Sequence, residues 1–262
     1  MKQRMPVLFI GHGSPMNAIA DNVYTKTLTT LGQTLLKPKV ILVISAHWMT
    51  RGTYVTRMKR PKTIHDFGGF PQELFDVQYL APGSPETADL IRSLVREPEI
   101  GADDTEWGLD HGTWSVLRHM YPKAEIPVLQ MSLSINDPPE YHMKLAEQLK
   151  SLRDKGVMIL GSGNIVHNLR QIKWEENAKP HDWALEFDEW MKVQLENRDY
   201  KKIMAEAFTS TAGRLSSPTP DHFLPIYYAL GASDSSDELK FEFEQMQNAS
   251  LSMRSLSLGR QN

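Results

Sequence analysis

The sequence predicts a single α/β domain, spanning residues 1–262, with a mostly parallel central sheet and helices on both faces. Three observations support this fold class. Short β-branched runs alternate along the chain with segments of helical periodicity. The length of 262 residues suits one large domain. The last segments alternate apolar and polar residues, which predicts a short antiparallel part at the C-terminal end.

The first two thirds of the chain supply the parallel part of this prediction. Strands are expected where β-branched and apolar residues run together, at 6–10, 40–46, 126–133 and 157–162. Helices are expected between them, at 22–36, 84–95 and 138–152. The second helix has the clearest start, because Ser84 can act as its N-cap and Pro85 suits its first position.

The remaining segments depart from this alternation. A charged helix is expected over 182–207 and a short helix over 221–230, and 241–244 and 251–258 are expected to pair as antiparallel edge strands. The stretch 53–82 is rich in glycine and proline and has little helical period. It is interpreted either as a functional lid or binding loop, or as a surface excursion with one short strand.

Composition excludes several classes of function. A net charge of −3 and a pI near 6.3 give no indication of nucleic-acid binding. The absence of cysteine excludes disulfides, thiolate metal sites and a cysteine nucleophile. No run approaches the about 18 apolar residues that span a bilayer. The basic N-terminal residues lead into an apolar run too short for a signal peptide, so we expect a cytoplasmic protein that does not associate with membranes.

Three histidines follow predicted strands. His12 comes after the first strand, His47 after the second and His167 after the fourth. If these strands are parallel neighbours, the imidazoles gather at the sheet edge where open α/β folds build their sites. Neutral imidazoles grouped in this way indicate a transition-metal site.

Other histidines are less informative by pattern alone. His222 follows a proline-rich turn and suits a structural role at least as well as a ligand role. His111 lies beside two tryptophans and a carboxylate, which fits an aromatic-substrate pocket or an exposed helix start equally well. Three more are expected to be surface residues: His119, His142 and His181. The chain has no nucleophile elbow, P-loop or zincin motif.

Six short motifs in this order resemble the class III extradiol ring-cleavage dioxygenases, in particular their DOPA dioxygenase group. They are GHGSPMN at 11–17, SAHW at 45–48, IHDFGGFP at 64–71, GLDHGTW at 108–114, GNIVHNL at 163–169 and PTPDH at 218–222. The resemblance extends from about residue 6 to the C-terminus. It implies a one-domain α/β fold and a mononuclear non-haem metal, with Fe(II) expected for catalysis and Zn(II) as an alternative occupant.

The resemblance also implies roles for individual residues. His12, His47 and His222 would bind the metal, and His167 would act as an acid/base residue or as a further ligand. His111 and His65 would line the pocket for a catechol, and His111 would also be a catalytic residue. Asp221 lies next to His222, and adjacent side chains diverge, so only one of the two is expected to reach the metal.

The expected activity is opening of a catechol ring, such as that of DOPA, by O₂. Two alternatives stay open: a zinc hydrolase with histidine ligands, and a non-catalytic metal-binding member of the same fold. Small-molecule catechol and O₂ are the expected partners of a monomer or small homo-oligomer.

Overall fold

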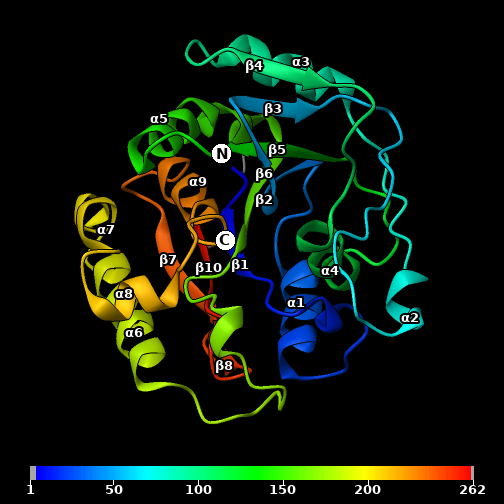
Figure 1. Ribbon diagram of the computed structural model, residues 1–262. Coiled ribbons are helices and arrows are strands. Elements are labelled where there is room, and N and C mark those ends of the chain that lie inside the picture. The colour runs from blue at the N-terminus through cyan, green and yellow to red at the C-terminus, as the bar shows by residue number, and fades with distance from the viewer. Residues whose placement is uncertain (1–3, 261–262) are drawn as a thin grey trace.

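The computed structural model describes residues 4–260, and they form one α/β domain around an eight-stranded mixed sheet (Figure 1). The strand order is β4-β3-β5-β2-β6-β1-β10-β7. In chain order these strands are β1 (Val7–Gly11), β2 (Val40–Thr50), β3 (Thr53–Thr56), β4 (Ile100–Asp103), β5 (Val128–Ser134), β6 (Val157–Gly163), β7 (Glu238–Phe243) and β10 (Ser255–Gly259). The predicted fold class is confirmed, and the predicted domain limits, 1 and 262, lie just outside the described residues.

Four neighbouring strands at the centre, β5, β2, β6 and β1, are parallel. Alternate residues of these strands enter different cores. Val7 and Phe9 of β1 belong to one apolar cluster, whereas Leu8 and Ile10 belong to the other. Because successive side chains point to opposite faces, continuously apolar strands require cover on both sides.

Helices on both faces supply that cover. On one face lie α1 (Val23–Thr34) and α4 (His111–Met120). The other face is covered by α3 (Pro85–Leu94), α5 (Pro139–Leu149), α6 (Asp182–Glu196) and α9 (Pro225–Gly231). Figure 1 shows α1 and α4 on one side of the sheet and α5, α6 and α9 on the other. Ser84 caps α3 as predicted, accepting a hydrogen bond from the backbone of Thr87.

The C-terminal third differs in detail from the prediction. The helix expected over 182–207 is interrupted at Arg198, whose φ is positive at 54°. α6 ends before this residue, and α7 (Tyr200–Glu206) begins after it. The helix expected over 221–230 begins only at Pro225, after a turn. The strand expected over 251–258 is divided into β9 (Leu251–Ser252), which pairs with β8 (Met246–Gln247), and β10. The pairing of β7 with β10 at the sheet edge is antiparallel, as expected.

The stretch 53–82 contains β3, the short helix α2 (Gln72–Phe75) and a long irregular segment. Phe67 and Phe70 of the irregular segment pack against the same apolar cluster as α4, and they help to line the cavity described below. Among the described residues, no helix is both long and apolar enough to cross a membrane.

The surface position expected for His142 is wrong. This residue lies on α5 with its side chain fully buried, and its Nδ1 is 3.1 Å from the Tyr228 hydroxyl. Burial lowers its pKa to about 4. The helical pattern around residue 142 did not distinguish it from the exposed positions of α5, and packing against α9 explains its burial.

Candidate metal centre

The first two strand-end histidines meet at the carboxyl edge of the parallel sheet. His12 directly follows β1, whose neighbour β6 lies in the register Gly11 to Gly163. His47 lies inside β2, where the pairing with β5 shifts register between Ile44 and Met49. Such irregularities redirect side chains at functional sites. As a result the Nε2 atoms of His12 and His47 are 3.1 Å apart.

The turn before α9 brings His222 to the same point. The backbone N–H of Asn164, just beyond β6, donates to the His222 carbonyl oxygen at 2.8 Å. A Cβ at Gly163 would lie 2.1 Å from that oxygen, so only glycine permits this approach. One potential ligand atom from each of His12, His47 and His222 lies within 4.8 Å of the other two.

Hydrogen bonds at the other ring nitrogen set the tautomer of each imidazole. The Ser162 hydroxyl donates to the Gly112 carbonyl, so it accepts from His12 Nδ1, 3.0 Å away. His47 Nδ1 lies 3.3 Å from an Asp66 carboxylate oxygen, and His222 Nδ1 donates to Asp221. Each Nδ1 therefore carries the proton, and each Nε2 keeps a free lone pair.

This arrangement fits a metal ion. Two nitrogen lone pairs that face each other across 3.1 Å repel unless a cation lies between them. Burial, together with the neighbouring imidazoles, holds the pKa values of His12 and His222 well below the ordinary range. Burial and His111 lower the pKa of His47 to about 3. Neutral imidazoles are the form that binds transition metals.

Asp66 is a residue of this site that sequence reasoning did not single out. One of its oxygens is 2.9 Å from His111 Nδ1 and also accepts from His47, and the other accepts from the His111 backbone N–H. Burial favours its neutral form, but the hydrogen bond and charge of His111 outweigh this effect and lower its pKa to about 2. Only its place in the motif beside His65 could have indicated it.

His167 lies next to the three clustered histidines but outside their group. Its ring stacks on that of His222, with centroids 3.4 Å apart and planes 4° from parallel. Burial lowers the pKa of His167 to about 4. Its side chain lines the cavity in front of the cluster.

A cavity of about 590 Å³ opens in front of these imidazoles. Its walls include His47, His111, His167 and His222, with an aromatic side formed by Phe67 and Phe70. His65, expected to line the pocket, is not among the lining residues. Its ring packs against those of Phe67 and Trp114, and its Nε2–H donates to the Val77 carbonyl oxygen at 2.9 Å.

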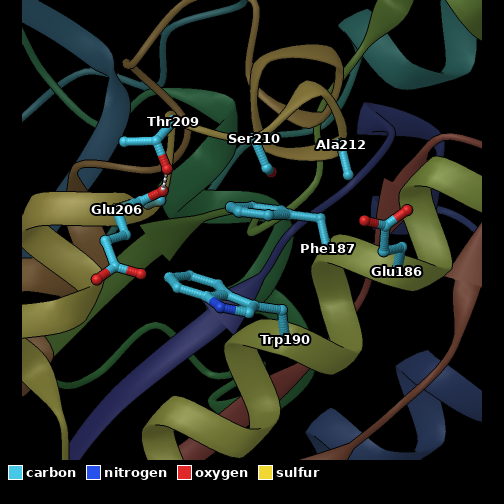
Figure 2. Close-up of a pocket in the computed structure, with 8 residues that line it drawn as sticks. Glu186, Phe187, Trp190, Glu206, Thr209, Ser210 and Ala212 are labelled. Carbon is cyan, nitrogen blue, oxygen red and sulfur yellow. Dashed lines mark hydrogen bonds between the residues drawn. The ribbon is translucent and has the colours of Figure 1, made fainter.

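A second, smaller cavity of about 170 Å³ lies between α6, α7 and α8 (Thr211–Ser216). Figure 2 shows its stacked Phe187 and Trp190 rings between the carboxylates of Glu186 and Glu206. Its lining contains no histidine. The histidine cavity at the sheet edge is therefore the candidate active site.

A doubly covered α/β sheet with a histidine cluster at its carboxyl edge is typical of a metal-dependent enzyme. Comparison with known families makes this more specific. Residues 6–255 match the family described as the catalytic LigB subunit of aromatic ring-opening dioxygenase. The chain belongs to this family, which confirms the resemblance to extradiol ring-cleavage dioxygenases, and it is an aromatic ring-opening dioxygenase.

Individual relatives cover nearly the whole chain. A 4,5-DOPA dioxygenase extradiol of Escherichia coli K12 is 46% identical over 98% of this chain and 95% of the relative. A 4,5-DOPA dioxygenase extradiol of Beta vulgaris is 38% identical, covering 86% of this chain and 85% of the relative. The crystal structure of an uncharacterized E. coli K12 protein superposes with a TM-score of 0.86 at 41% identity, covering 98% of this chain and 100% of that one.

Proposed function

We propose that this chain opens the ring of a catechol with O₂ by extradiol cleavage, with DOPA as the model substrate and Fe(II) as the metal. The observation that carries the proposal is the pair of Nε2 lone pairs of His12 and His47, 3.1 Å apart at the end of a substrate-sized cavity. The names of the E. coli and Beta vulgaris relatives support the choice of DOPA.

In this proposal His12, His47 and His222 hold the metal through Nε2. An Fe(II) ion bound there would supply the redox activity that couples an aromatic diol to O₂. Zn(II) fits the same nitrogen donors but is redox-inactive. The hydrogen bonds on each Nδ1 support the assignment, because metal-bound histidines usually donate their second N–H to an oxygen.

His167 and His111 act on the substrate. His167 accepts a proton from a catechol hydroxyl and later donates one to the oxygen that leaves when the O–O bond breaks. A neutral imidazole can serve first as base and then as acid. Its stacking on His222 supports this assignment, because it keeps the ring beside the proposed ligand. Asp66 engages Nδ1 of His111, so His111 keeps its Nε2 for a substrate oxygen.

Anaerobic reconstitution tests the proposal. The protein is loaded with Fe(II), mixed with DOPA, and then given O₂, while O₂ uptake and the product spectrum are recorded. We expect about one O₂ per substrate and a yellow ring-opened product. O₂ uptake with other catechols but not with DOPA would contradict the proposed substrate, and the same uptake by the zinc-loaded protein would contradict the assignment of Fe(II).

A His167→Gln variant belongs in the same experiment. Loss of an acid/base residue lowers kcat by about 10²- to 10⁴-fold, while Fe(II) content stays at the wild-type level because three ligands remain. If the variant loses Fe(II) as well, His167 is a ligand; if turnover is unchanged, it has neither role.

A further inference from the structure

Few charged groups line the active-site cavity. Among the described residues that form its walls, the carboxylates are Asp66 and Glu176, and none is a lysine or arginine. Asp66 is engaged by His47 and His111. Glu176 is therefore the charged group left to meet a ligand away from the histidines.

Glu176 is held in place on the wall. One oxygen of its carboxylate accepts hydrogen bonds from Asn22 Nδ2 at 2.8 Å and from Gln247 Nε2 at 3.2 Å. Its own carbonyl accepts from the Asn248 backbone at 2.9 Å, and the Lys173 backbone donates to Asn248 at 3.0 Å. These hydrogen bonds hold the segment around Glu176 against residues 247–249. No hydrogen bond from the described residues engages the second carboxylate oxygen of Glu176.

A continuous polar network links Glu176 to the candidate metal centre. Gln247 accepts a hydrogen bond from Asn17 Nδ2 at 3.0 Å, and the same group of Asn17 lies 3.2 Å from the His12 carbonyl oxygen. Asn17, Gln247 and Glu176 all line the cavity, whereas other parts of its wall are apolar, with Phe67 and Leu251. If a catechol binds with its diol at the histidines, its ring lies beside the apolar groups. The polar network is then available to its side chain.

We propose that Glu176 is a specificity-determining residue that selects catechols whose side chain carries an ammonium group. The free oxygen of its carboxylate would accept from the ammonium, whereas a tail bearing only a carboxylate would meet like charge without any cation on the wall to offset it. This inference rests on the proposed catechol cleavage and adds to it a residue that distinguishes substrates by tail charge.

Three catechols that differ in tail charge test the proposal: dopamine (cationic), 4-ethylcatechol (neutral) and 3-(3,4-dihydroxyphenyl)propionate (anionic). We expect kcat/KM of the wild type to follow this order. Glu176→Gln should lower kcat/KM for dopamine and raise it for the propionate, each by about three- to tenfold, since Glu176 is solvent-exposed. The value for 4-ethylcatechol should stay nearly constant. The wild-type preference should weaken as salt is added.

Glu175→Gln is the matched control, because Glu175 is also exposed but does not line the cavity. Three results would overturn the proposal. The wild type could show no preference for tail charge, Glu176→Gln could change kcat/KM equally for all three catechols, or Glu175→Gln could have the same effect as Glu176→Gln. Calorimetric binding of the same catechols to the zinc-loaded protein measures the preference without turnover. If no catechol is opened, the proposed function fails, and these affinities still decide the role of Glu176.

Discussion

The second nitrogen of each proposed ligand determines how the site balances charge. Asp66 and Asp221 accept from His47 and His222, whereas the neutral Ser162 accepts from His12. A set of three histidines brings no negative charge of its own to a divalent ion. The two carboxylates stand one hydrogen bond further away and supply that charge, and they also make their imidazoles better donors. In the proposed ligand set, Asp221 would thus contribute through its hydrogen bond with His222 and would not bind the metal itself.

Asp66→Asn tests this role of the carboxylates. The amide is neutral and has a single acceptor oxygen, so it cannot accept from both imidazoles and from the His111 backbone N–H as the carboxylate does, and His47 loses the negative charge beside its Nδ1. We expect affinity for Zn(II) to fall by about 10- to 100-fold, measured by competition with a chromophoric chelator. Asp76→Asn is the control, since Asp76 is an exposed residue at the end of α2. Equal affinities of Asp66→Asn and wild type would refute the role.

The sequence predicted the positions of the site residues unequally well. His12 and His47 could be identified because they follow apolar strands and parallel strands end at a common edge. His222 required the family resemblance, because its approach depends on a contact between a distant turn and Gly163. Asp66 was not singled out because a carboxylate in an irregular loop has no periodicity, and its partners lie far along the chain.

At the scale of elements, local pattern predicted the parallel sheet and failed where tertiary contacts decide. The strands β1 and β6 were found within about one residue because their apolar runs are uninterrupted. The extension of β2 past His47 was missed, because it crosses polar residues and a register shift. The break between α6 and α7 was missed as well, since charged residues continue the helical pattern through Arg198.

A buried ion pair connects the turn before β6 with the segment before β7. The Arg153 guanidinium donates to both oxygens of Asp237, at 2.7 and 2.9 Å, and both side chains are almost fully buried. Asp237→Asn leaves Arg153 charged and buried without its bidentate partner, and the carboxylate that remains, Asp234, is 4.0 Å away. We expect the free energy of unfolding at pH 7 to fall by about 3–5 kcal/mol, measured by urea denaturation. Asp154→Asn is the control, because the carboxylate of Asp154 belongs to an ion pair but is exposed to solvent. This substitution should change the free energy of unfolding by at most about 1 kcal/mol.

The same pair gives stability a pH dependence of known sign. Burial favours a raised pKa for Asp237, but hydrogen bonds from Arg153 and the Asp234 backbone outweigh it and hold the pKa below its ordinary value. A lowered folded-state pKa adds stability above the unfolded value of about 4. This contribution is lost as the pH falls through the folded value. The gap in stability between wild type and Asp237→Asn should therefore narrow below about pH 4, and a constant gap would contradict the assignment.

At the scale of the whole molecule, the candidate metal centre joins distant parts of the chain. The proposed ligands are His12, His47 and His222, which come from the residue after β1, from β2 and from the turn before α9. In the unfolded chain these residues are not held together. An ion that binds the folded state alone must stabilise it, so the ligand set can be tested through stability, independently of turnover.

Metal titration of thermal unfolding makes this test. At a free Zn(II) concentration 100 times Kd, binding adds about 2.7 kcal/mol to the free energy of unfolding, which corresponds to a rise in Tm of about 5–10 °C for a domain of this size. His12→Ala should lose most of this rise, whatever its own Tm without metal. His181→Gln should keep it, because His181 lies on an exposed segment and bonds the Gln171 carbonyl. An equal rise in His12→Ala and wild type would place the ion elsewhere and would remove the basis for the proposed ligand set.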